Sequence, residues 1–125
     1  MLADRPSTGS DSRSPAGSSA GVALIVINVI VFVLQHSRGG ESRLFTLQYA
    51  ALSLDGLEHG YVWQLLSFQF LHDGISHLLM NSLALYFLGV PTEQALGRKS
   101  FLQLYFLSGT FGVLLQILLA LLCPN

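Results

Sequence analysis

Three long apolar stretches constrain the fold of this chain more than any other feature of its sequence. They cover residues 20–36, 75–90 and 101–123. A membrane-spanning helix needs about 20 consecutive apolar residues, because the hydrocarbon core is about 30 Å thick. Hydrophobic residues make up 51% of the chain and charged residues 10%, whereas soluble domains carry about 25% charged residues. The sequence therefore predicts an all-α, multi-pass membrane protein with three transmembrane helices.

The remaining segments predict a tail and one domain. Residues 1–19 are mostly Ser, Gly, Pro, Asp and Arg, a composition that predicts a disordered tail, and residues 20–125 are expected to form a partial domain. Residues 37–74 form a long outer loop that is too apolar to be a plain connection, and its Tyr61 and Trp63 are typical of membrane interfaces. We therefore expect short interfacial helices within this loop.

Local signals indicate where the second stretch begins and ends, and which way the chain crosses the membrane. Asp73 is expected to cap the second helix and Pro91 to end it. The short loop after Pro91 carries Arg98 and Lys99. Positive residues in short loops favour the cytoplasm, so we expect a cytoplasmic amino terminus and place the long loop outside.

The third stretch carries small and polar residues on one face. Ser108, Gly112 and Gln116 are four residues apart, and Gly109 adjoins them. Such residues let helix backbones approach closely and let an amide bond across helices. This face predicts packing against another helix, and self-association through it is a second expectation.

His77 and Asn81 are the residues most suggestive of a functional site. They are four residues apart in an apolar stretch, so they share one face of the expected helix. Polar side chains are costly within a membrane and often belong to a site. Both could donate hydrogen bonds to a developing oxyanion. From spacing alone, a purely structural role between helices remains equally open.

Other arrangements of polar residues are weaker candidates. His72 and Ser76 are four apart but have no third group to orient them, and Ser76 fits a capping role. His72, Asp73 and His77 could suggest a metal site, but an i, i+5 histidine pair does not share a helical face. The residues around Glu93 indicate a solvated loop charge, with a tie to a neighbouring helix as the alternative.

Composition also restricts the partners. The net charge of −1 leaves no basic stripe for nucleic acid. The single cysteine, Cys123, excludes an internal disulfide and a cysteine-based zinc site. The expected partner is the lipid bilayer, and no cofactor or metal is implied.

The motifs that run from the loop through the second stretch resemble those of the rhomboid family of intramembrane serine proteases. The segment WQLLSFQFLHDGISHLLMNSLALYFLG and the following TEQALG carry the family's tryptophan, FLH, HxxxN and ExxxG in order. The resemblance covers residues 28–116. It implies a six-helix core with an outward-facing site, of which this chain would supply the first three helices.

The resemblance assigns roles to individual residues. It implies that His77 and Asn81 help form the oxyanion hole, and it matches His72 to a histidine near that site. Glu93 and Gly97 match the structural turn after the second helix. The chain departs from the family at Gln64 and Ala95, where many members have basic residues.

The family's nucleophilic serine, in a GxSG-type motif, and its basic histidine have no counterpart here. The only Ser-Gly pair after the second stretch is Ser108-Gly109, inside the third. We therefore expect a truncated serine endopeptidase, inactive as the 125-residue chain, that in complete form hydrolyses transmembrane substrates in the plasma membrane of a bacterium. The alternative is a non-catalytic rhomboid-like membrane module that binds transmembrane helices.

Overall fold

Every regular element of the described chain is a helix. The computed structural model describes residues 19–37 and 39–123. Of the predicted disordered tail, residues 1–18 lie outside the described part and only Ser19 is included. Three helical segments are long and apolar enough to cross a membrane, which confirms the predicted all-α membrane fold; they are Ala20–Ser37, Ile75–Leu96 and Arg98–Leu122.

The first and third of these segments are single helices, α1 (Ala20–Ser37) and α7 (Arg98–Leu122). The second segment is composite, with a π-helical turn in its middle. It consists of α5 (Ile75–Ala84), the π turn η2 (Leu85–Gly89) and α6 (Val90–Leu96).

The long connection contains the expected short helices. They alternate with brief non-helical stretches, so that most backbone groups of the connection are satisfied locally. The connection comprises α2 (Gly40–Ala50), α3 (Leu54–Glu58), α4 (Gln64–Ser67) and the 3₁₀ turn η1 (Phe68–Phe70).

The ends of the second segment differ from those predicted. Gly74 rather than Asp73 occupies the N-cap position of α5, and no side chain caps the helix there. Pro91 does not end the helix, which continues to Leu96. The Val90 N–H bonds to the Leu85 carbonyl, five residues back, so the hydrogen-bond ladder has already shifted where the proline enters. The third helix begins at Arg98, slightly earlier than expected.

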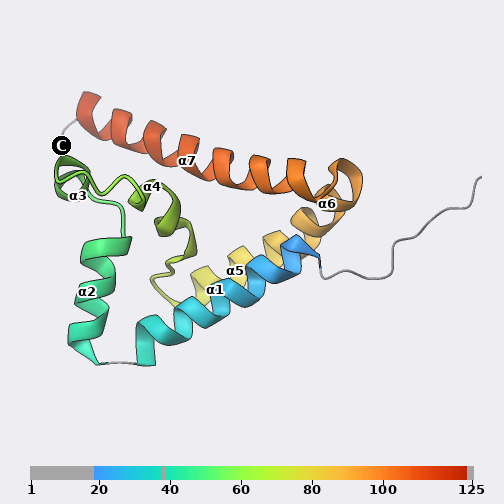
Figure 1. The fold of residues 1–125 in the computed structure, drawn as a ribbon, viewed down its shortest axis with the longest axis horizontal. Coiled ribbons are helices and arrows are strands. Elements are labelled where there is room, and N and C mark those ends of the chain that lie inside the picture. The colour runs from blue at the N-terminus through green and yellow to red at the C-terminus, as the bar shows by residue number, and fades with distance from the viewer. Residues whose placement is uncertain (1–18, 38, 124–125) are drawn as a thin grey trace, which may run out of the picture.

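Helix α1 packs along α5, η2 and α6 (Figure 1). Gly21 makes this approach possible, because a Cβ there would lie 3.1 Å from a Val90 methyl group. The core lies where α1, η2 and the beginning of α7 meet, and it consists of Ala20, Leu24, Leu85 and Phe101, with Ile25, Phe70, Leu102, Tyr105 and Phe106 against them.

Glu93 ties α6 to the beginning of α1. Its carboxylate accepts hydrogen bonds from the backbone N–H groups of Ala20 at 2.8 Å and Gly21 at 3.0 Å, and from the Ser19 hydroxyl. The Arg98 guanidinium lies 3.5 Å away, and the Glu93 side chain is only 10% exposed. The expectation of a solvated loop charge at Glu93 is therefore wrong, because the helix that binds it is distant in sequence.

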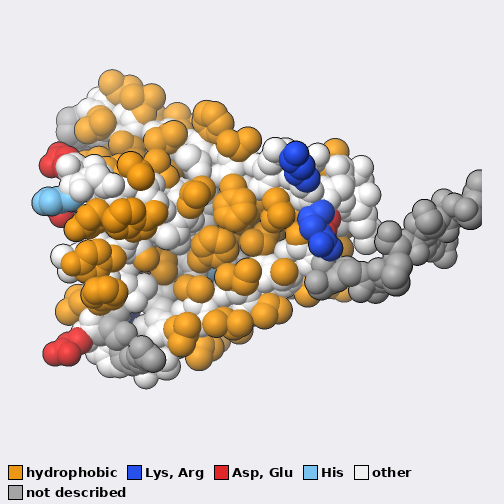
Figure 2. All heavy atoms as spheres, viewed as in Figure 1, with side chains coloured by type: hydrophobic (Ala, Val, Ile, Leu, Met, Phe, Trp, Pro, Cys, Tyr) orange, Lys and Arg blue, Asp and Glu red, His pale blue; other side chains and the backbone are white. Residues whose placement is uncertain are grey.

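Beyond its first turns, α7 leans away from α1, and α3 and α4 lie beside its outer half (Figure 1). Its apolar side chains are largely exposed; Phe111, for example, is 68% exposed. Figure 2 shows apolar side chains across the middle of the molecule, with Lys and Arg gathered at one end. So large an apolar surface does not face water. The protein is an integral membrane protein, and this surface contacts lipid.

Candidate functional site

The structure brings His72, His77 and Asn81 together at the loop end of α5. His77 and Asn81 lie one turn apart on α5, and His72 lies in the segment that precedes the helix. The rings of His72 and His77 meet edge to face, with centroids 5.1 Å apart. The His72 Nε2 atom lies 3.0 Å from the Asn81 Nδ2 atom.

The three side chains differ in exposure. His72 is 2% exposed, Asn81 is half-buried and His77 is exposed. The His72 Nδ1 atom lies 3.1 Å from the carbonyl oxygen of Phe70. Burial, which disfavours a charged imidazole, lowers the pKa of His72 below its usual value of 6.5 and outweighs the opposing effect of the Phe70 carbonyl. His72 is therefore a neutral, hydrogen-bonded group at neutral pH.

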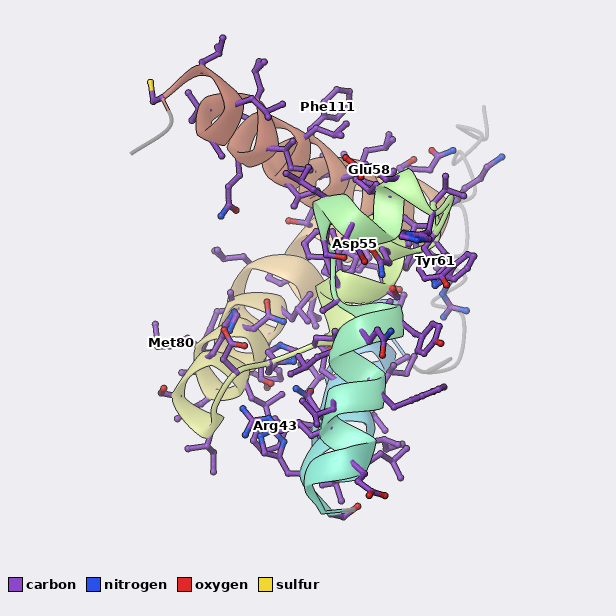
Figure 3. All side chains as sticks on the ribbon, turned by 90° about the vertical axis from the view of Figure 1, so that its left-hand side faces the viewer. Arg43, Asp55, Glu58, Tyr61, Met80 and Phe111 are labelled. Atoms are coloured by element: carbon purple, nitrogen blue, oxygen red, sulfur yellow. The ribbon has the colours of Figure 1, made fainter. Side chains whose placement is uncertain are left out.

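These residues line a cavity of about 610 Å³ between α5, the outer half of α7 and the loop. Figure 3 looks onto this end of the molecule. In this view α5, marked by Met80, stands apart from α7, marked by Phe111, and α3 is marked by Asp55. The wall is mixed: apolar side chains from α2, η1 and α7 alternate with polar groups. The polar lining residues are Ser53, Gln69, His72, Asp73, His77, Asn81 and Gln116.

The loop that forms one wall is held by Gln64, which is completely buried. Its Nε2 donates to the Gln48 carbonyl at 3.1 Å, and its Oε1 accepts from the Ser53 N–H at 3.3 Å. Trp63 donates from its indole N–H to the Tyr49 carbonyl at 2.9 Å. Gln64, at the position where the resemblance leads us to expect a basic residue, thus joins α2, α3 and α4 through hydrogen bonds.

A second anchor joins the loop to α7, and the sequence did not reveal it. The Gln69 Nε2 atom donates to the Phe106 carbonyl at 3.2 Å. The amide lies directly over Gly109, where a Cβ would come within 2.4 Å of it. The only signal in the sequence is a glycine within α7, and its spacing predicts a helix-packing face instead.

The other residues of that predicted face lie differently. Ser108, Gly112 and Gln116 are exposed, and a Cβ at Gly112 would meet nothing within 4 Å. Gln116 contributes to the cavity wall. Packing of this face against another helix, or against a second copy of the chain, stays a prediction.

The remaining sequence candidates do not join the cluster. Within residues 19–37 and 39–123, no serine hydroxyl bonds to a histidine ring, and no three potential metal ligands converge. Glu93 lies in the first turn of α6 and Gly97 at its C-cap, both after the π turn and so at the other end of the second segment from the cavity. His36 and His59 each bond a carbonyl four residues earlier in their own helices or turns.

The chain is similar to known proteins over most of its described length. The family model described as Rhomboid domain matches residues 59–123, just over half of the chain. Rhomboid protease GluP of Bacillus subtilis is 34% identical over 89 residues, which are 70% of this chain and 18% of that protein. Rhomboid-like protease 3 of Toxoplasma gondii is 33% identical over 98 residues, 78% of this chain and 37% of that protein.

A third relative is named as inactive. Inactive RHOMBOID-like protein 8 of Arabidopsis thaliana is 35% identical over 68 residues, 54% of this chain and 19% of that protein. The chain thus spans well under half the length of each of these three relatives. No solved structure gives a significant match to the chain.

Proposed function

This chain belongs to the rhomboid family, and on that premise we propose that it forms the oxyanion-stabilising part of an intramembrane serine endopeptidase. The observation that carries the proposal is the cluster of His72, His77 and Asn81 on the wall of a cavity between α5 and α7. Polar side chains within a membrane-spanning segment cost free energy of folding, and those that are present often belong to a functional site.

The proposed chemistry assigns hydrogen-bond donation to His77 and Asn81. A serine hydroxyl oxygen adds to the carbonyl carbon of a peptide bond while its proton passes to a basic histidine, both groups being expected outside the described residues, and the carbonyl oxygen becomes an oxyanion. The Asn81 amide N–H and a His77 ring N–H would donate to that oxygen. The His77 ring forms no hydrogen bond with another described residue, so its N–H is free to donate.

The surroundings of the cavity support this role. Apolar side chains form part of the wall, and where they exclude water the lower local dielectric strengthens a donor's interaction with a developing charge. Both donors project from the first turns of a helix, and the loop beside them is fixed by Gln64 and Gln69. Donors held in this way need little reorganisation during the reaction.

We also propose the substrate class and the orientation. Substrates would be transmembrane proteins cleaved at the loop end of the molecule, where the cavity opens. Arg98 and Lys99 lie at the opposite end, so by the positive-inside rule the amino terminus is cytoplasmic and the cavity faces outward. The location that we propose is the plasma membrane of a bacterium, the kind of organism from which one relative, Rhomboid protease GluP of Bacillus subtilis, comes.

A second candidate function rests on the inactive relative. In that case the chain is a non-catalytic membrane module, and the same cavity binds transmembrane helices without cleaving them. The described residues supply oxyanion donors but no paired nucleophile and base, which is compatible with both functions.

The test measures cleavage of a transmembrane reporter in membranes that contain the proposed complete form of the protein, in which this chain is joined to the segment that supplies the serine and the basic histidine. Asn81→Ala should lower kcat by about 10²–10³-fold with little change in KM, because it removes one donor to the oxyanion. Met80→Ala is the matched control, since the neighbouring Met80 side chain is 66% exposed and should not affect cleavage. Unchanged kcat in Asn81→Ala would refute the oxyanion role. If the unmodified protein cleaves nothing but crosslinks transmembrane helices at the cavity, the second candidate is correct.

A further inference from the structure

The hydrogen bond between His72 and Asn81 joins groups whose donor and acceptor roles depend on each other. A neutral imidazole carries one N–H and one acceptor nitrogen, and a side-chain amide carries an acceptor oxygen and an NH₂ group. Knowing the role of either partner therefore determines the role of the other. Both side chains line the cavity, and His72 is 2% exposed.

The backbone of the loop decides these roles. The His72 Nδ1 atom lies 3.1 Å from the Phe70 carbonyl oxygen, which can only accept, so Nδ1 must carry the hydrogen. In the neutral ring Nε2 is then an acceptor. The Asn81 atom 3.0 Å from Nε2 must accordingly be the amide nitrogen and not the carbonyl oxygen.

This arrangement leaves one Asn81 N–H uncommitted. The amide group has two N–H bonds; one donates to His72, and the carbonyl oxygen is turned away from the ring. Without His72, the Asn81 amide could rotate by half a turn at little cost. Half of its orientations would then replace the donor with an oxygen, which repels an anionic ligand.

We propose that His72 is a positioning residue that fixes the orientation of the Asn81 amide, so that its second N–H faces a carbonyl or oxyanion ligand in the cavity. The inference rests on the proposed function, because it specifies how one of the two donors is oriented. The Phe70 carbonyl determines which His72 nitrogen carries the hydrogen, and through it the orientation of the Asn81 amide. The turn η1 (Phe68–Phe70), which holds this carbonyl, is bound to α7 through Gln69.

The test is nuclear magnetic resonance on the unmodified chain in detergent micelles, with ¹⁵N-labelled histidine and asparagine. At pH 7.5, His72 should show a protonated Nδ1 and an unprotonated Nε2. A ¹⁵N–¹⁵N coupling across the hydrogen bond should link Nε2 to the Asn81 amide nitrogen. A protonated Nε2, or the absence of this coupling, would overturn the inference.

Two variants of His72 separate positioning from general packing. His72→Gln retains an oxygen acceptor near the place of Nε2, whereas His72→Phe retains the ring shape without an acceptor. Exchange of the Asn81 amide hydrogens with water should be about tenfold faster in His72→Phe than in the unmodified chain, because one hydrogen bond is lost. His72→Gln should restore slow exchange, and equal exchange in both variants would refute positioning.

The control variant is Met80→Ala, which should leave the His72 tautomer and the coupling unchanged because the Met80 side chain is 66% exposed. If His72→Phe does not fold, the tautomer and coupling in the unmodified chain still decide the matter. The proposed function fails separately: Asn81→Ala with unchanged cleavage would refute the oxyanion role, whereas the spectra report only on the His72–Asn81 hydrogen bond.

Discussion

At the residue scale, the Glu93 carboxylate joins α6 to the beginning of α1. Glu93→Gln should lower the free energy of unfolding by about 1.5–3 kcal/mol, because the neutral amide accepts weaker hydrogen bonds from the Ala20 and Gly21 N–H groups. Denaturation in mixed detergent micelles measures this change. Glu58→Gln is the control, since Glu58 is exposed on the loop. Equal destabilisation by both variants would contradict the assigned role of Glu93.

Two glycines of α7, Gly109 and Gly112, offer a matched comparison. Gly109→Ala places a methyl group against the Gln69 amide and should break its bond to the Phe106 carbonyl, whereas Gly112→Ala meets open space. Both substitutions replace glycine with a better helix former, which by itself should raise the free energy of unfolding by about 1 kcal/mol. We therefore expect Gly109→Ala to be about 1 kcal/mol less stable than Gly112→Ala, from the loss of one hydrogen bond. Indistinguishable unfolding curves for the two variants would show that Gln69 does not anchor α7.

Individual residues differ in how far the sequence could predict their surroundings. The shared helix face of His77 and Asn81 could be predicted, because helical spacing is local and two residues four apart lie on the same face. The partnership of His72 with Asn81 depends on the path of the loop, which spacing does not specify. Glu93 was misassigned because its partners, the first N–H groups of α1, are distant in the sequence.

At the element scale, the loop segment α2–α3 depends on Gln64. Gln64→Ala removes the hydrogen bonds to Gln48 and Ser53 and empties a fully buried position, so the backbone N–H groups of α2 and α3 should exchange with water faster. The free energy of local opening of α2 and α3 should fall by about 1–3 kcal/mol. Hydrogen exchange read by mass spectrometry measures it segment by segment.

The control for the loop is Gln103→Ala, which removes an exposed glutamine from α7. It should leave exchange in α2 and α3 unchanged. If Gln64→Ala also left that exchange unchanged, the loop would be held mainly by Trp63, whose indole N–H bonds the Tyr49 carbonyl independently.

The existence of elements was easier to predict than their ends. Apolar length alone identified the three long helical segments, because crossing a bilayer imposes a minimum length. Pro91 gave a misleading stop signal, since the π turn Leu85–Gly89 lets the helix continue through it. Nothing in residues 85–89 marks a π turn, and the turn packs against α1, a contact that local sequence does not specify.

At the scale of the whole molecule, polar groups are separated between its two ends. The end where α6 meets α7 carries Arg98 and Lys99, and the opposite end carries the loop and the cavity (Figure 2). The cavity exists because α7 contacts the loop through α4 but leans away from α5. The proposed donors, His77 and Asn81, therefore lie at the end for which the positive-inside rule predicts an outside location.

Cys123, the single cysteine of the sequence, lies exposed at the cavity end of α7 and can report this orientation. A membrane-impermeant maleimide should label Cys123 in intact cells, because the positive-inside rule predicts that the other end of α7, with its basic residues, lies in the cytoplasm. In a Cys123→Ser background, Lys99→Cys should be labelled only after permeabilisation, since Lys99 is exposed at the opposite end of the same helix. The reverse pattern would place the cavity in the cytoplasm, and the proposed outward-facing site would then be wrong.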